Sequence, residues 1–69
     1  MALEKCVGQL SDAYRSVFLL YEVEGFQHSE IAQMLGISEG ASKNRLFEAK
    51  RELRKMLTRI PGVLEKVRP

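Results

Sequence analysis

The chain of 69 residues is 45% apolar and 29% charged and carries a formal net charge of +2, which excludes a disordered segment and predicts one small domain, residues 1–69. Its single cysteine, Cys6, excludes an internal disulfide and a CxxC zinc site. Because no apolar run approaches the roughly 20 residues needed to cross a bilayer, and the N-terminus lacks the pattern of a signal peptide, we expect a soluble, cytoplasmic protein.

The first part of the chain predicts two helices. Residues 2–9 form a short first helix that Gly8 weakens, because glycine loses more backbone freedom in a helix than other residues do. Ser11 offers a capping hydroxyl for a second helix, which begins at Asp12 and reaches a C-cap at Gly25. The apolar run VFLLY within it, taken alone, also fits a buried strand. The thirteen residues between the cap and the glycine favour the helix, because buried strands are shorter.

Two further helices joined by a tight turn are predicted in the second part. The first, residues 27–35, has apolar side chains on one face at i, i+3 and i+4 spacing (Ile31, Met34 and Leu35). Gly36 ends it, since glycine accepts the left-handed backbone of a helix C-cap. Ser38 can cap the second helix, residues 38–59, and the Pro-Gly pair at 61–62 stops it before a short tail, residues 60–69. This arrangement is a helix-turn-helix, whose second helix usually enters the major groove of DNA.

Three polar residues at the start of helix 27–35 have ordinary structural explanations. Gln27 is a weak cap. Glu30 is expected to favour the helix N-terminus electrostatically, with a direct contact to the next helix or to DNA as the less favoured alternative. His28 is expected to be a surface residue, because nothing near it in the sequence completes a metal or catalytic site.

The last helix combines an apolar stripe with a basic outer face. The stripe repeats at helical spacing and contains Ser42, Leu46, Ala49, Leu53, Met56 and Ile60. Between positions 43 and 59, seven basic residues face two acidic ones, a net of +5, whereas residues 1–42 hold two basic and six acidic residues, a net of −4. The small net charge therefore hides a polarised molecule whose basic helix suits a phosphate backbone.

The outer face of that helix carries residue types that read bases. Asn44 can pair with adenine, Arg51 with guanine, and Phe47 can press on a thymine methyl group. Glu48 can accept a hydrogen bond from a cytosine amino group. The alternative is a solvated helix face with one stray aromatic side chain. An exposed phenylalanine in the middle of a basic face favours base contact.

Several basic and hydroxyl side chains around this face suit contacts with phosphates, which position a protein without reading sequence. The competing explanation is a solvated helix surface with intrahelical ion pairs such as Glu52–Lys55. The residues predicted to contact the DNA backbone are Ser38, Ser42, Arg45, Lys50, Arg54 and Lys55, and Lys43 also suits a phosphate. No nucleophile–base pair, metal-ligand spacing or glycine-rich phosphate loop occurs in the sequence, so we expect neither an enzyme nor a bound metal or cofactor.

Two stretches of the chain resemble region 4 of bacterial RNA polymerase sigma factors, particularly the extracytoplasmic-function group. These stretches are LSDAYRSVFLLYEVEGF and EIAQMLGISEGASKNRLFEAKRELRKML, which together cover most of the chain from about Leu10 to Leu57. The EIA and LGIS segments are shared with other helix-turn-helix regulators, but their combination with both flanks is much more specific. Ala41-Ser42 departs from the Thr-Val that the family usually has near the start of its last helix.

The resemblance implies an all-α module of four helices that ends in a helix-turn-helix without a wing. Its last helix would read the −35 element of a promoter, and its earlier helices would hold the flap of the polymerase β subunit. Carried onto this chain, the positions that face bases are Lys43, Asn44, Phe47 and Arg51, and Arg45 matches a backbone-contacting or structural arginine. The apolar surface of Tyr14, Val17, Phe18 and Tyr21 would supply the core and part of the interface with polymerase or an anti-sigma factor.

Other functional hypotheses remain beside promoter recognition. The main alternative is a sigma-like adaptor that binds RNA polymerase or an anti-sigma factor with little specific DNA binding. The DNA-binding end of a response regulator is disfavoured by the long basic extension after Ala49. The chain lacks the region that melts the −10 element, so it is not expected to initiate transcription by itself. Nothing in the sequence demands a dimer, and we expect a monomer.

Overall fold

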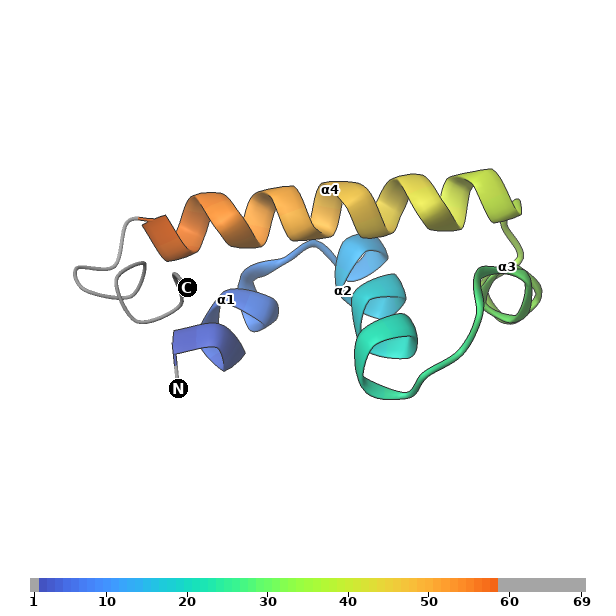
Figure 1. Cartoon of the computed structure of the whole chain (residues 1–69), viewed down its shortest axis with the longest axis horizontal. Helices are drawn as coiled ribbons and strands as arrows, with labels where there is room; N and C mark the ends of the chain where they lie inside the picture. The colour runs from blue at the N-terminus through green and yellow to red at the C-terminus, as the bar shows by residue number, and fades with distance from the viewer. Residues whose placement is uncertain (1, 59–69) are drawn as a thin grey trace, which may run out of the picture.

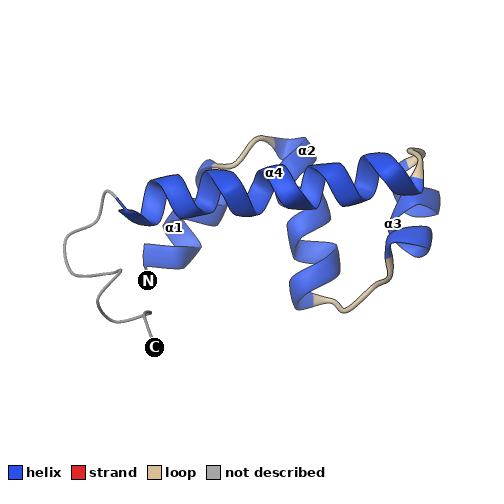
Figure 2. Cartoon of the chain, turned by 45° about the horizontal axis from the view of Figure 1, so that its top comes forward, coloured by secondary structure: helices blue, strands red, loops and turns tan. Residues whose placement is uncertain are grey.

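A computed structural model describes residues 2–58, with the side chains of residues 4–58. The described residues contain helices and no strand (Figures 1 and 2). The elements are α1 (Ala2–Gln9), α2 (Asp12–Phe18), the π-helix η1 (Leu19–Val23), α3 (His28–Leu35) and α4 (Glu39–Thr58). The prediction of an all-α module of four helices is therefore confirmed, with η1 continuing α2. The predicted end of the last helix at Arg59, the apolar position Ile60, the Pro61-Gly62 stop and the tail lie outside the described residues.

Helix α4 lies across all the others. Its 20 residues span about 30 Å at 1.5 Å per residue, and α1, α2 and α3 all pack on the same side of it (Figure 1). One stripe of α4 is therefore covered along most of its length, while the opposite face has no neighbour among the described elements. This arrangement presents a long helix face to solvent.

Two hydrophobic clusters lie along the covered stripe of α4. We call the first the α1 cluster; its buried residues are Cys6, Leu10, Ala49 and Leu53, and Val7, Tyr14, Phe18, Met56 and Leu57 pack around it. We call the second the turn cluster; its buried residues are Val17, Ile31 and Leu46, surrounded by Phe18, Leu20, Phe26, Leu35 and Ile37. Phe18 belongs to the surroundings of both, so the two clusters join at α2.

The predicted caps are confirmed. The Ser11 hydroxyl accepts a hydrogen bond from the Tyr14 amide at 3.4 Å, and the Ser38 hydroxyl accepts one from the Ala41 amide at 3.0 Å. Gly36 is left-handed, with φ of 67°, which lets the Ile37 amide reach back to the carbonyl of Ala32 at 3.0 Å. These contacts satisfy backbone groups that helix ends leave without partners.

The second predicted helix has the expected extent, but its last turns are wider than an α-helix. Over η1 the amide of residue i+5 donates to the carbonyl of residue i, as the Glu24 amide does to the Leu19 carbonyl at 3.0 Å. Beyond it, Gly25 takes a φ of 82°, and the Phe26 amide bonds the Leu20 carbonyl at 2.9 Å. The strand alternative for VFLLY is wrong.

Side chains add two further connections that the sequence pattern did not predict. The backbone amide of Gln27 donates to the Glu30 carboxylate at 2.9 Å. Glu30 therefore supports the start of α3 by a direct hydrogen bond as well as by its charge. Arg15 donates to the carbonyls of Gly8 and Leu10, each at 3.2 Å, and pairs with Asp12. Arg15 thereby ties the end of α1 to α2, since a cation suits the carbonyl end of a helix.

Candidate nucleic-acid interface

The two faces of α4 differ sharply in burial. Ser42, Leu46, Ala49 and Leu53 are all buried, which confirms the predicted stripe as far as Leu53, and Met56, its next position, is half-buried. On the opposite face Asn44, Phe47 and Arg51 are exposed. They occupy i, i+3 and i+7, so they project from one side of the helix and can meet one ligand together.

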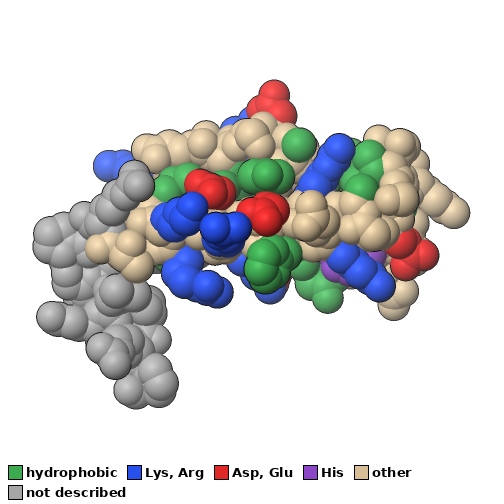
Figure 3. Space-filling view, turned by 90° about the horizontal axis from the view of Figure 1, so that it is seen from above, with side chains coloured by type: hydrophobic (Ala, Val, Ile, Leu, Met, Phe, Trp, Pro, Cys, Tyr) green, Lys and Arg blue, Asp and Glu red, His purple; other side chains and the backbone are tan. Residues whose placement is uncertain are grey.

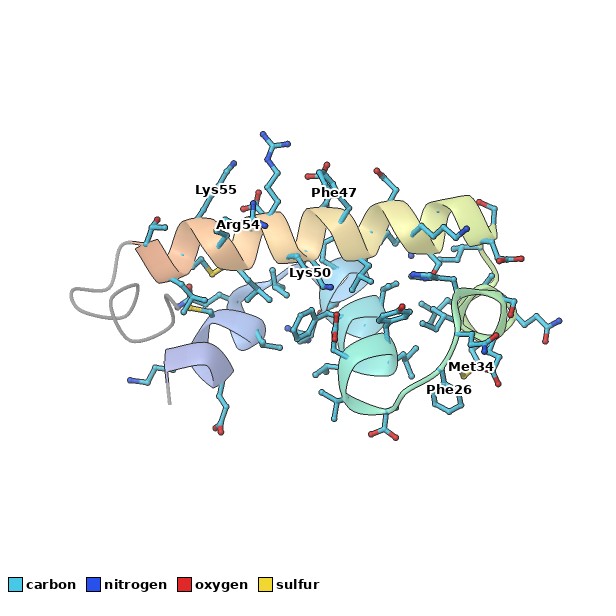
Figure 4. All side chains as sticks on the ribbon, viewed as in Figure 1. Phe26, Met34, Phe47, Lys50, Arg54 and Lys55 are labelled. Carbon is cyan, nitrogen blue, oxygen red and sulfur yellow. The ribbon has the colours of Figure 1, made fainter. Side chains whose placement is uncertain are left out.

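Phe47 is the most informative residue of the exposed face. Its relative exposure is 64%, and it belongs to neither hydrophobic cluster. Figure 4 shows it pointing away from the other helices. A large aromatic side chain in this position makes no contribution to the core, so burial of its surface must come from a binding partner if it comes at all.

Carboxylates neutralise part of the positive charge of α4. Arg51 lies 3.7 Å from Glu48 and Lys55 lies 3.6 Å from Glu52, the latter being the predicted intrahelical pair. Figure 3 shows Lys and Arg side chains interleaved with Asp and Glu on the face seen from above. Both pairs are partly exposed, so each contributes at most about 1 kcal/mol to folding. They also reduce the field that a phosphate backbone would meet.

Lys50 occupies a different environment from the other predicted phosphate contacts. Its ammonium group lies 2.7 Å from the carboxylate of Glu22, so it connects α4 with η1. Figure 4 shows Lys50 on the side of α4 toward the other helices, away from Phe47. Lys43 and Arg54 are exposed, and Arg45 is half-buried. Neither Lys43 nor Arg54 forms an ion pair with another residue of the described part of the chain.

The two predicted hydroxyl contacts to phosphate have separate outcomes. Ser38 is exposed, although its hydroxyl already accepts the Ala41 amide. Ser42 is 0% exposed, so the prediction that it touches the DNA backbone is wrong for this fold. The physical reason was visible in its spacing, because Ser42 lies on the same helical stripe as Leu46 and Ala49.

His28 is not the plain surface residue that the sequence suggested. Its Nδ1 lies 2.7 Å from the Ser42 hydroxyl, and its ring stacks on Tyr21 with 4.5 Å between centroids and 18° between planes. The pair is 14 residues apart in sequence, so no local pattern predicts it. One feature of the sequence could have indicated such a contact: Ser42 lies on the apolar stripe of α4, and a buried hydroxyl needs a hydrogen-bond partner.

The four residues of the predicted partner surface on the second helix lie in different environments and do not form one exposed patch. Val17 is buried in the turn cluster, Tyr14 and Phe18 are half-buried against the α1 cluster, and Tyr21 stacks on His28. The exposed large apolar residues that the sequence reasoning missed on η1 are Leu19 and Val23. Met34, which was expected on the apolar face of α3 with Ile31 and Leu35, is 48% exposed instead. Leu19 and Val23 are four residues apart within one helical run, a spacing that could have shown a shared face.

Other kinds of site find no support in the described part of the chain. No three His, Cys, Asp or Glu side chains there gather closely enough to hold a metal ion. None of the helices between residues 2 and 58 has the length and apolar character that crossing a membrane requires. The exposed face of α4, where Phe47 lies among basic side chains, is the strongest candidate for a functional site.

Comparison with known protein families shows which family the chain belongs to. A family model described as sigma-70, region 4, matches residues 1–53. The chain belongs to the sigma-70 region 4 family. Searches of curated proteins and of solved structures gave no significant match. The family match covers α1 through most of α4 and ends at Leu53.

Membership of this family establishes the general function. A sigma-70 region 4 domain is a non-enzymatic helix-turn-helix module that recognises the −35 element of promoters in transcription initiation. The family implies binding to promoter DNA and to RNA polymerase. In this chain the helix-turn-helix consists of α3, the Gly36 turn and α4.

Proposed function

We propose that α4 reads the −35 element through Lys43, Asn44, Phe47 and Arg51. The observation that carries this proposal is the 64% exposure of Phe47 in the middle of a basic helix face. An aromatic ring there can cover a thymine methyl group, while Asn44 and Arg51 on either side offer bidentate hydrogen bonds to adenine and guanine. Arg51 must leave Glu48 to do so, which a partly exposed pair with a 3.7 Å separation permits at low cost.

In this proposal, contacts with the phosphate backbone come from the remaining exposed cations. Arg54 and Lys55 lie on or beside the side of α4 that carries Phe47 (Figure 4), and exposed Lys43 lies four residues before Phe47, on the same side of the helix. Arg45 is half-buried and remains only the position that matches the family's backbone-contacting or structural arginine. Ser38 caps the N-terminus of α4, where the helix dipole favours a phosphate. Lys50 can take part only by giving up its pair with Glu22. Ser42 is not included, because it is buried.

We also propose that RNA polymerase binds the opposite side of the domain, at the β flap in the core enzyme. Leu19 and Val23 expose apolar surface on η1, which lies across α4 from the outward face (Figure 1). A partner there leaves the DNA-reading side chains free, so both contacts can form at once. An anti-sigma factor would compete for the same surface. This proposal places the domain in the cytoplasm as a monomer, together with polymerase.

The test of base reading is a substitution of Phe47 with a matched control. The wild-type chain first selects its preferred duplex from a randomised pool. Phe47→Ala should then weaken binding to that duplex by about 1–3 kcal/mol, without lowering the unfolding temperature. Val23→Ala is the control, because Val23 is equally exposed at 66% but lies on η1, and it should leave DNA affinity unchanged.

The adaptor alternative gives the opposite pattern in the same experiment. If the domain only binds protein, no duplex is enriched, and Phe47→Ala leaves binding to the polymerase core unchanged. The exposed apolar residues of η1 favour this alternative, since they require no DNA. A charge at Val23, as in Val23→Asp, should abolish polymerase binding under either hypothesis. Only the loss of duplex discrimination at Phe47, Asn44 or Arg51 separates the two.

A further inference from the structure

Three side chains from three different elements meet at the beginning of the recognition helix. Tyr21 of η1 stacks on His28 at the start of α3, and His28 Nδ1 lies 2.7 Å from the hydroxyl of Ser42 in α4. Ser42 is 0% exposed and is the single buried polar side chain in the described part of the chain. No buried side-chain polar atom there lacks a hydrogen-bond partner.

A hydrogen bond at this place constrains the helices in a way that apolar packing does not. Two apolar surfaces can slide or rotate by a fraction of an ångström with little change in energy, whereas a bond requires a defined distance and angle. Breaking it leaves a buried hydroxyl without a partner, which costs more than the bond itself contributes. The stacking on Tyr21 holds the plane of the His28 ring, so the direction of the bond is also fixed.

The position of Ser42 connects this bond with DNA recognition. Ser42 directly precedes Lys43 and Asn44, which project from the same turn of α4. A rotation or shift of this turn relative to α3 therefore moves those two side chains with it. The register of the recognition helix in the groove follows from how α4 sits on α3, since the first helix crosses the DNA backbone while the second reads bases.

We propose that His28 is a positioning residue, which acts through Ser42 to set the orientation of α4 on α3 and thereby the aim of Lys43 and Asn44. This inference rests on the proposed base reading by α4. It does not depend on the tautomer of the imidazole, because the Ser42 hydroxyl donates to a bare Nδ1 or accepts from an Nδ1–H. His28 itself touches no base in this proposal.

Four variants separate positioning from a merely structural contribution. Ser42→Ala removes the hydroxyl, and His28→Phe keeps a ring for Tyr21 while removing the hydrogen bond. His28→Asn restores a polar atom near the position of Nδ1 and should rescue part of the binding, because it lacks the ring that stacks on Tyr21. Ser11→Ala is the matched control, because it removes another bonded serine hydroxyl, at the cap of α2, far from the contact between α3 and α4.

Two quantities are measured. Residual dipolar couplings of the backbone amides report the orientation of α4 relative to α3. Titration reports the affinity of the folded fraction for the duplex selected by the wild-type chain. Ser42→Ala and His28→Phe should change the couplings of residues 39–46 and reduce discrimination against a scrambled duplex by roughly 10-fold, as for a lost base contact. Ser11→Ala should lower the unfolding temperature only.

The inference is overturned if Ser42→Ala and His28→Phe behave like Ser11→Ala, with lower stability but unchanged couplings and unchanged discrimination. His28 is half-buried, so its variants should fold even if Ser42→Ala does not. If the wild-type chain selects no duplex, the proposed base reading fails, and the dipolar couplings alone then decide whether His28 positions α4. The two failures are therefore distinguishable.

Discussion

The two ends of α4 are held in different ways. At the α1 end, Leu53 and Ala49 pack with Cys6 and Leu10, and the polar contribution comes from Arg15, which binds carbonyl groups at the end of α1. At the turn end, Leu46 packs with Val17 and Ile31, and directional contacts surround this apolar centre. They include the Gly36 cap, the Glu30 bond at the start of α3, and the His28–Ser42 pair.

This difference shows where the geometry of the domain has to be accurate. Apolar burial supplies free energy without specifying direction, which is sufficient for a helix that only covers a core. Hydrogen bonds and a left-handed cap fix angles, which a helix needs when its side chains must reach base edges. The contrast predicts that equal losses of stability at the two ends have unequal effects on DNA binding.

The strongest test of the contrast compares Leu46→Ala with Leu53→Ala. Both residues are leucines of α4, 7% and 5% exposed, and each truncation should cost about 2–4 kcal/mol of unfolding free energy. Leu46→Ala should also reduce DNA affinity per folded molecule and speed hydrogen exchange in α3, while Leu53→Ala should speed exchange in α1 and spare affinity. Chemical denaturation, exchange and titration measure these effects. Equal losses of affinity in the two variants would contradict the contrast.

Gly36→Ala tests the left-handed cap alone. A Cβ at Gly36 meets no atom within 4 Å, and φ is 67°, so the cost is backbone strain of about 1–2 kcal/mol. We expect a lower unfolding temperature and weaker duplex discrimination, because the turn between α3 and α4 would relax toward another backbone conformation. Retention of full discrimination would show that the turn tolerates this change without moving α4.

Gly8→Ala acts in the opposite direction at the other end of the molecule. Gly8 lies inside α1, and an added Cβ again finds nothing within 4 Å, but here the backbone is helical. The substitution should stabilise the domain by about 0.5–1 kcal/mol, because alanine loses less freedom than glycine on folding. Thermal unfolding would show the gain, and DNA affinity should not change.

The smallest expected effect concerns the ion pair between α4 and η1. Glu22→Gln removes the partner of Lys50 and should cost less than about 1 kcal/mol, because both side chains are partly exposed and salt screens them. The freed lysine should raise affinity for random duplexes at low salt. Glu24→Gln, an exposed neighbour outside the described ion pairs, is the control. Similar gains in both variants would mean that only net charge matters.

The sequence was sufficient to predict the elements, but not the contacts between them. Helix α1 begins and ends as predicted, and the caps at Ser11, Gly36 and Ser38 follow from local chemistry that needs no tertiary information. The widened turns of η1 were not predicted, because apolar spacing shows which face is buried and not how many residues complete a turn.

At the candidate site, too, the sequence predicted the exposed and buried faces of the helix but not the contacts between distant residues. Apolar periodicity correctly separated Phe47 on the outside of α4 from Leu46 and Ala49 on the inside. It could not show that Lys50 pairs with Glu22 or that His28 reaches Ser42, since these contacts join distant parts of the chain. Ser42 was misassigned because its residue type suggested phosphate binding, although its position on the apolar stripe indicated burial.

The carboxylates along α4 also have a consequence for how such a domain finds its target. A genome offers roughly 10⁶–10⁹ competing sites, and every unpaired cation would lengthen the stay on each wrong one. In the free domain a carboxylate pairs with each of three cations, Lys50, Arg51 and Lys55. A random stretch of DNA must therefore displace a carboxylate for each contact that it makes with one of them. Brief visits to wrong sites shorten the search, and residence time then depends on the base contacts that only the right sequence provides.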